Sequence, residues 1–152
     1  MAGENIYSMW LEAPDIVSSA GPGQFISLYS DDKSRLLPRP ISICETDAEK
    51  GRLRIVYRTV GAGTKEFSEK QPGDIIKIIG PLGNGFPVGN SDLPVSINDD
   101  TRALLIAGGI GIPPMLQLAK TISCKKTIIL GYRDETFLDD ELAAFGDIVI
   151  AT

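Results

Sequence analysis

The stretch ALLIAGGIGIPPMLQLA, residues 103–119, decides the fold prediction for this chain. Its first five residues form a compact apolar run, which is typical of a strand buried on both faces of a parallel sheet. A glycine-rich turn, Gly108 to Gly111, follows this run. Pro113 or Pro114 then stands at the first helical position, where proline is favoured. Strand, glycine turn and helix in this order predict the first unit of a parallel α/β sheet.

The residues after this stretch continue the alternation. Thr127–Leu130 and Ile148–Ala151 are short apolar runs that predict strands, and Leu138–Phe145 between them predicts a short helix. Strands that alternate with helices indicate a parallel sheet. A sheet of about three strands would leave apolar edges unpaired, so we expect a chain clipped from a longer α/β domain. A small, complete α/β lobe is the alternative.

The residues before the stretch follow a different pattern, in which short β-forming segments are separated by glycine and proline. Turn signals stand at Gly21-Pro22-Gly23 and at Gln71-Pro72-Gly73-Asp74, where these residue types favour the backbone angles of tight turns. Many short strands with turns between them predict an antiparallel barrel or sandwich. The predicted strands are Ile6–Leu11, Phe25–Tyr29, Pro40–Cys44, Leu53–Val60 and Ile75–Ile79.

A linker is predicted between these two patterns. Ser91–Thr101 is polar and shows no hydrophobic periodicity, which is typical of a connecting segment. We therefore expect two domains, residues 1–97 and residues 98–152.

Composition narrows the classes of function. The 152 residues include 15 basic and 20 acidic side chains, for a formal net charge of −5. This charge disfavours a nucleic-acid partner, which needs a basic surface, and an anionic membrane surface. No apolar run approaches the ~20 residues that span a bilayer. Met1–Ser8 lacks the basic and apolar parts of a signal peptide, so we expect a cytoplasmic protein without a membrane partner.

Histidine is absent from the sequence, which removes Ser-His and Cys-His nucleophilic schemes and imidazole metal sites. The two cysteines, Cys44 and Cys124, are too few for a disulfide framework and lack metal-ligand spacing. We therefore predict neither a catalytic side chain nor a metal site. A chain with so little acid–base equipment fits a redox role, in which a bound cofactor carries the chemistry.

Two motifs in the barrel half suit an anionic cofactor. Arg39, at a predicted strand edge, can pair bidentately with a phosphate, and Ser42 can hydrogen-bond a ring nitrogen. Their odd spacing puts them on opposite faces of a regular strand. Both meet one ligand only if the strand twists or bulges, or if the arginine side chain reaches round. The turn Gly61-Ala62-Gly63-Thr64 can bring backbone N–H groups to an anion, with Thr64 as the predicted helix N-cap.

Two glycine-rich segments complete the set. Gly80-Pro81-Leu82-Gly83-Asn84-Gly85-Phe86 predicts a loop that brings the backbone close to a planar ring. The turn Gly108 to Gly111 joins a strand to a helix, which is the context of a nucleotide-binding turn. Counted from Gly109, Pro114 takes the place of the last glycine of the dinucleotide fingerprint, so a standard Rossmann FAD site is not predicted. Each motif alone also fits an ordinary turn or strand edge.

The order of these motifs resembles the ferredoxin reductase superfamily. Within it, RPIS at residues 39–42, Tyr57-Arg58, Gly63-Thr64 and GPLGNGFP at residues 80–87 resemble the electron-transfer subunit of dihydroorotate dehydrogenase type B, over nearly the whole chain. The resemblance implies an antiparallel β-barrel FAD-binding domain. The first part of a parallel α/β nicotinamide-nucleotide-binding domain would follow it.

The resemblance also implies roles for particular residues. RPIS would hold the FAD phosphate and isoalloxazine, residues 56–58 the flavin mononucleotide portion, and Gly63-Thr64 the pyrophosphate. The turn Gly108 to Gly111 would shape the cleft for NADH, with Gly131-Tyr132-Arg133 at its edge. The implied cofactor-binding residues are Arg39, Pro40, Ile41, Ser42, Val56, Tyr57, Arg58, Gly63, Thr64, Gly108, Gly109 and Gly111.

The function that the resemblance implies is NADH oxidation in pyrimidine biosynthesis. Electrons would pass from NADH through FAD and a 2Fe–2S cluster to the FMN-containing dihydroorotate dehydrogenase catalytic subunit, in a heterotetramer. Family members have another barrel strand at their start and a cysteine-rich tail that ligates the cluster. The four thiolates of such a cluster are absent here. We therefore expect a chain truncated at both ends, with an incomplete NADH site and no cluster.

Two other functions remain open from the sequence. One is the electron-transfer subunit of a related enzyme, such as a sulfide dehydrogenase or a hydrogenase, because the superfamily motifs are shared. The other is a non-catalytic β-barrel interaction module, which would bind no FAD.

Overall fold

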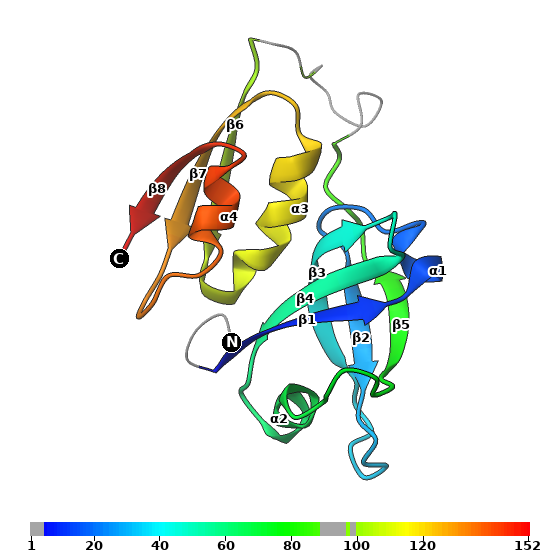
Figure 1. Ribbon diagram of the computed structural model, residues 1–152. Helices are drawn as coiled ribbons and strands as arrows, with labels where there is room; N and C mark the ends of the chain where they lie inside the picture. Colours follow the sequence, from blue (N-terminus) through cyan, green and yellow to red (C-terminus); the bar gives the residue numbers. More distant parts are fainter. Residues whose placement is uncertain (1–4, 89–96, 98–99) are drawn as a thin grey trace.

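The computed structural model describes residues 5–88, 97 and 100–152, which form two sheets (Figure 1). Five antiparallel strands make the first sheet in the order β1-β4-β3-β2-β5, and three parallel strands make the second in the order β6-β7-β8. The predicted fold class, an antiparallel barrel followed by a parallel α/β unit, is confirmed. The predicted linker, Ser91–Thr101, and the predicted domain boundary lie largely outside the described residues.

The five strands of the barrel enclose their own hydrophobic core. Alternate residues of β4 point inward, and Leu53, Ile55 and Tyr57 are all at most 1% exposed. They pack against buried side chains of β2 and β3 and against Phe67, as expected for strands whose side chains alternate between two faces. The elements are β1 (Ile6–Glu12), α1 (Pro14–Val17), β2 (Phe25–Tyr29), β3 (Arg39–Asp47), β4 (Arg52–Arg58), α2 (Ala62–Ser68) and β5 (Lys77–Leu82).

The last barrel strand differs from its prediction. The predicted strand Ile75–Ile79 begins at Lys77 and continues to Leu82, so the first three residues of the predicted loop Gly80–Phe86 belong to β5. β5 pairs with β2 alone among the described strands, and an edge strand can include a proline. Gly80 lets β5 approach β2 closely, because a Cβ there would lie 2.6 Å from a methyl carbon of Ile26. The short helix α1 was not predicted.

The barrel has an open seam between β1 and β5. Within the described part of the chain, β1 pairs only with β4 and β5 only with β2. A cavity of about 490 Å³ lies between them, lined by residues 7–11 of β1, by Tyr57 and by the segment before β5. The backbone groups on these two strand edges are therefore unpaired within the first sheet.

The second sheet confirms the strand–turn–helix prediction. β6 (Arg102–Gly108) leads through the 3₁₀ turn η1 (Gly109–Gly111) into α3 (Pro113–Thr121). β7 (Lys125–Gly131), α4 (Asp139–Ala143) and β8 (Asp147–Ala151) follow. α4 is shorter than predicted because Leu138 adopts a left-handed conformation (φ 64°) at its N-cap. Among the described residues, no helix is long and apolar enough to cross a membrane.

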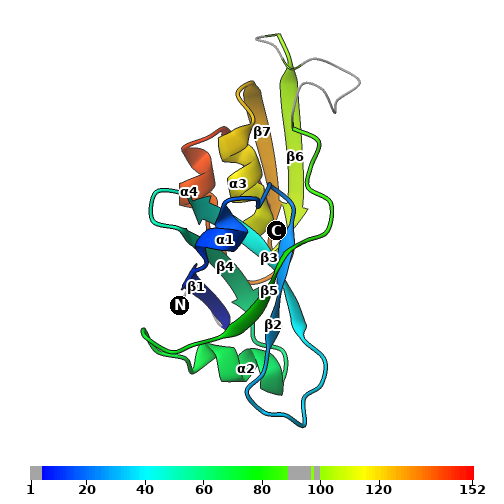
Figure 2. The same ribbon diagram turned by 90° about the vertical axis from the view of Figure 1, so that its right-hand side faces the viewer.

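The two faces of the second sheet differ. Both α3 and α4 lie on one face (Figures 1 and 2), where Leu105, Ile128 and Leu130 are buried. On the other face Leu104 and Ile106 are 60% and 66% exposed. Among the described residues, the helices cover one face and no element covers the other.

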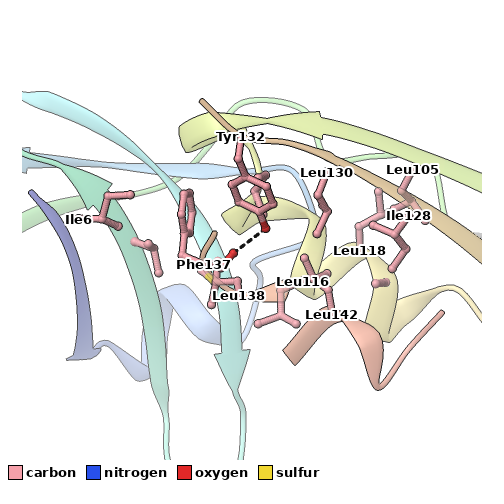
Figure 3. Packing of buried hydrophobic residues seen from close by; sticks show 14 residues of the cluster. Ile6, Leu105, Leu116, Leu118, Ile128, Leu130, Tyr132, Phe137, Leu138 and Leu142 are labelled. Carbon is pink, nitrogen blue, oxygen red and sulfur yellow. Dashed lines mark hydrogen bonds between the residues drawn. The ribbon is translucent and has the colours of Figure 1, made fainter. Parts of the chain in front are cut away.

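The core beneath the helices is shared with the barrel. It contains Ile6, Cys44 and Val56 of the barrel together with Ile112 and Leu116 of the second sheet's helical layer. Figure 3 shows the cluster, with Ile6 of the barrel at one end and Leu105 and Ile128 of the second sheet at the other. Val56 points to this core, whereas its neighbours Ile55 and Tyr57 point into the barrel. The outer surface of β1, β3 and β4 therefore fixes where the α/β domain sits.

Candidate functional site

A pocket of about 320 Å³ lies where the barrel meets the α/β domain. The start of β3 and the end of β4 form its floor, because the two strands are antiparallel neighbours. All seven predicted residues of β3 and β4 line it, together with Thr64. Its lining residues are Arg39, Pro40, Ile41, Ser42, Val56, Tyr57, Arg58, Val60, Thr64 and Ile110.

Arg39 and Ser42 reach the pocket from different faces of β3. Ile41 and Ile43 pack toward the barrel core, so the alternation expected of the strand holds between them. Arg39 is the first residue of β3, and its side chain lies against Gly63, where a Cβ would be 2.8 Å from Nε. The arginine thus reaches round to the pocket. Gly63 belongs to the site by making room for it.

Thr64 has a role other than the predicted one. Helix α2 begins at Ala62 with Gly61 at the N-cap, so the prediction of Thr64 as N-cap was wrong. From the third helical position its hydroxyl accepts hydrogen bonds from the N–H groups of Val60 (3.0 Å) and Gly61 (3.3 Å) and donates one to the Gly61 carbonyl (3.0 Å). Thr64 therefore holds the loop at the pocket edge by reaching back along the chain, as the third residue of a capping box does.

Tyr57 lies between the pocket and the seam cavity and lines both. It is 1% exposed, and its hydroxyl has no hydrogen-bond partner among the described residues. Burial, with a smaller contribution from Tyr7, raises the pKa of Tyr57 to about 12. The side chain therefore stays neutral, and its hydroxyl is a buried polar group that lacks a protein partner.

The α/β domain contributes to the pocket in a way that the sequence did not predict. Gly108, Gly109 and Gly111 do not line it, but Ile110, which stands between the last two, does. Gly109 has a φ of 51°, a left-handed conformation that glycine adopts at little cost. The glycines shape the turn, and the isoleucine within it makes the contact. Glycines are the usual sequence signal of a nucleotide-binding turn, whereas an isoleucine between them carries no such signal.

Other sequence candidates lie away from the pocket. Tyr132 is buried in the shared core, where its hydroxyl donates to the Phe137 carbonyl at 2.9 Å (Figure 3), and Arg133 is exposed. Cys44 is fully buried, and burial raises the pKa of its thiol to about 12. It is therefore a packing residue and no nucleophile. Among the described residues, no three acidic or cysteine side chains group in a way that could hold a metal ion.

Comparison with known proteins agrees with this geometry. The sequence model of the family described as "Oxidoreductase FAD-binding domain" matches residues 3–86. The chain is 37% identical to the "Dihydroorotate dehydrogenase B (NAD(+)), electron transfer subunit" of Geobacillus kaustophilus, over 100% of this chain and 59% of that protein. The subunit of the same name from Fusobacterium nucleatum is also 37% identical, over 98% and 58%. The chain thus spans about three-fifths of the length of these curated relatives.

Solved structures show the same fold. A structure of an NADH-dependent reduced ferredoxin-NADP oxidoreductase, described for flavin-based electron bifurcation, superposes with a TM-score of 0.83 at 27% identity. It covers 99% of this chain and 53% of that one. A flavohemoglobin from Malassezia yamatoensis superposes with a TM-score of 0.75 at 24% identity, covering 100% and 43%. With its barrel matched across β1 to β5 and its relatives carrying one name, the chain belongs to the FAD-binding domain family of oxidoreductases.

Proposed function

We propose that this chain binds FAD in the pocket between its two domains and passes electrons from NADH toward a partner subunit. The observation that carries this proposal is the convergence in one pocket of two cations, Arg39 and Arg58, with an apolar floor. FAD has the matching parts, a planar ring system and a pyrophosphate with negative charge. Such a mixture of apolar lining and a few placed polar groups is typical of cofactor sites.

The residues present fit the cofactor in two respects. Gly63 leaves a space beside the Arg39 guanidinium that any Cβ would fill, so the cation lies where the backbone of α2 begins. Arginine forks match phosphate oxygens bidentately, and we assign the FAD pyrophosphate to Arg39 with Gly63 and Thr64. Thr64 also fixes the loop at the pocket edge, because its hydroxyl accepts hydrogen bonds from the N–H groups of Val60 and Gly61.

The remaining residues orient the ring. Ser42 can donate a hydrogen bond from the floor, and Ile41 and Ile110 present apolar surface on which a flat ring can lie, with Val56 buried beneath. Bound FAD would supply hydride acceptance and single-electron release. The protein's part is orientation and exclusion of water, which needs no acid–base side chain. This agrees with a chain that has no histidine.

We assign NADH oxidation and a partner subunit to this chain because its relatives are named as the electron transfer subunit of an NAD-dependent dihydroorotate dehydrogenase. NADH would approach the ring past the turn Gly108 to Gly111, with residues 98–152 as part of its domain and residues 1–97 as the FAD domain. The acceptor would be an FMN-containing dihydroorotate dehydrogenase catalytic subunit in a cytoplasmic heterotetramer for pyrimidine biosynthesis. A 2Fe–2S cluster between them needs four thiolates. This sequence has only two cysteines, so we place the cluster's ligands outside these residues.

The first test is the visible spectrum of the purified chain after soaking with FAD and desalting. A retained flavin spectrum is expected, with FAD identified by chromatography of the released cofactor. Arg39→Ala should weaken FAD binding by about 1.5–3 kcal/mol, the value of hydrogen bonds to charged groups, which is roughly tenfold to a hundredfold in Kd. Arg102→Ala, which removes an exposed arginine at the start of β6, is the matched control.

The two possible failures test different claims, the role of Arg39 in the site and the binding of FAD by the chain. Equal FAD binding by Arg39→Ala and the wild type would remove Arg39 from the site. A chain that retains no FAD at all would favour a β-barrel interaction module over an electron-transfer protein.

A further inference from the structure

An ion-pair network joins the barrel to the α/β domain at the end of β3 and β4 away from the pocket. Glu45 accepts hydrogen bonds from Arg54 (2.9 Å) and from Lys120 of α3. Arg54 also donates to both carboxylate oxygens of Glu141 at the start of α4, at 2.7 and 3.1 Å, and to the Ser8 hydroxyl at 2.7 Å. Each helix of the α/β domain is thereby tied to the barrel by one ion pair.

A β-bulge places Glu45 in this network. Ile43 faces the barrel core and pairs with Ile55, but the register then shifts, so that Glu45 pairs with Arg54. Strict alternation from Ile43 through Cys44 would point Glu45 into the barrel, and the shift in register turns it outward instead. Bulges often re-aim a side chain in this way next to functional sites. The bulge in β3 thus turns the carboxylate of Glu45 outward, toward α3.

The two central side chains of the network, Glu45 and Arg54, are largely buried, so their ion pair can affect stability. The side chains of Glu45 and Arg54 are 10% and 14% exposed, whereas those of Lys120 and Glu141 are 35% and 45% exposed. Exposed ion pairs contribute little to stability, but removal of one partner from a buried pair leaves an uncompensated charge. Glu45 is the centre of the network, because it alone meets a cation from each domain.

The same outward face carries the pocket at its other end. Arg54, Val56 and Arg58 alternate along β4, so that the ion pair, the shared core and the pocket follow one another on a single strand face. On the opposite side of the interface, α3 makes the same connection. Lys120 lies near the C-terminal end of α3, and the turn that contains Ile110 lies just before the N-terminal end of this helix. Two rigid elements therefore link the network to the pocket.

A further contact fixes the direction of α3. The backbone N–H of Thr46 donates to Oε1 of Gln117 at 3.0 Å, one turn before Lys120. Between these polar contacts and the turn, Ile112, Met115 and Leu116 pack in the shared core. Apolar contacts are non-directional, so the ion pair and the Gln117 hydrogen bond together set the orientation of α3 on this core.

We infer that Glu45 and Arg54 are positioning residues, which through Lys120 and Glu141 hold the turn at residues 109–111, and Ile110 with it, against the pocket. That the pocket takes FAD rests on the proposed function. The positioning role of these residues is independent of the proposed function, and it can be measured without the cofactor.

The test is amide hydrogen exchange of the FAD-free chain, read by mass spectrometry in peptides that cover residues 109–113. Glu45→Gln and Lys120→Met should each speed exchange there by roughly tenfold or more, because the buried pair is broken. The double variant should exchange about as fast as Glu45→Gln alone, since the ion pair that Lys120→Met removes is already lost in Glu45→Gln. Glu49→Gln, which removes an exposed carboxylate in the turn after β3, is the matched control. If Glu45→Gln does not fold, Lys120→Met carries the test.

Bound flavin gives the second readout. Quenching of FAD fluorescence by iodide should increase by about twofold in both variants, with FAD retention unchanged, if Ile110 moves away from the pocket. Faster exchange confined to the surroundings of residues 45 and 120 would overturn the inference. Faster exchange at residues 109–113 without stronger quenching would overturn the link to the pocket. A wild type that binds no FAD would refute the proposed function, and the exchange result would still decide the positioning role.

Discussion

The barrel and the α/β domain form their hydrophobic cores in different ways. The barrel turns one face of its sheet onto a core made of its own residues, and Leu53 and Ile55 are fully buried there. The second sheet has a core on one face only, and three barrel residues complete it. Its other face leaves Leu104 and Ile106 mostly exposed, although parallel sheets are normally covered on both faces. The barrel thus supplies its own core, while the α/β domain depends on the barrel for part of its core.

The largest expected effect sharpens this contrast directly. Ile55→Ala should lower the free energy of unfolding by about 2–5 kcal/mol, since it empties space in a fully enclosed core. Ile106→Ala, on the bare face of β6, should change it by no more than about 0.5 kcal/mol. Urea denaturation of both variants measures the difference. Equal destabilisation by the two would mean that the bare face is covered in solution.

The next effect concerns the contact between the domains. Burial alone would raise the pKa of Glu45, but hydrogen bonds from Lys120 and Arg54 outweigh it and hold the pKa below the ordinary 4.5. A lowered pKa stabilises the fold above the unfolded-state pKa, and that contribution is lost as the pH falls through the folded-state pKa. At neutral pH, Glu45→Gln should cost about 1.5–3 kcal/mol.

That cost should shrink as the pH falls below about 4.5. Unfolding free energies of wild type and Glu45→Gln, measured side by side across the acid range, check this. The other carboxyls with lowered pKa values, Asp32, Asp47 and Glu66, are present in both proteins and cancel in the difference. A difference that stays constant with pH would show that the carboxylate is not ion-paired in the folded protein.

A smaller effect separates stability from binding within the barrel. Gly63→Ala should stabilise α2 by up to about 1 kcal/mol, because alanine favours helix. Its Cβ would also displace the Arg39 side chain. We expect displacement to cost about 1 kcal/mol of FAD binding, or roughly fivefold in Kd. Thermal unfolding without FAD and titration with FAD should therefore move in opposite directions. A loss in both would mean that the backbone, and not Arg39, yields.

The smallest expected effect concerns the unpartnered hydroxyl of Tyr57. A buried polar group without a hydrogen bond costs about 1–3 kcal/mol, and part of this is recovered when the group is removed. Tyr57→Phe should therefore leave the FAD-free chain as stable as the wild type or up to about 1 kcal/mol more stable. Binding of FAD should stay nearly unchanged, because the side chain points into the barrel core. Marked destabilisation would show that the hydroxyl has a partner, such as a water molecule.

The sequence predicted the elements and the residues of the pocket floor, because these depend on local patterns. Alternation and turn residues mark the strands, and RPIS with residues 56–58 marks two neighbouring strand ends. Three features were missed, one that depends on local hydrogen bonds and two that depend on long-range contacts. Thr64 reaches back to Val60 and Gly61 instead of beginning the helix. Gly80 continues a strand because Ile26 faces it.

The third feature is the bulge at Cys44. The predicted strand Pro40–Cys44 ended one residue before Glu45, and only the register with β4 reveals the direction of this carboxylate and its cations. Ile110 was missed for a related reason. Its role depends on the contact between the domains, and a pattern within one domain does not contain that contact.

Strand β4 belongs to two cores at once, and this has a consequence for the order in which the protein matures on the ribosome. The barrel strands are complete once Leu82 has been synthesised, but α3 ends only at Thr121. The roughly 40 residues between them take several seconds at about 5–20 residues per second. During that interval Ile6, Cys44 and Val56 form an apolar patch that awaits its cover. Transiently exposed apolar surface promotes aggregation, so this patch is where the nascent chain is most open to wrong contacts until α3 covers it.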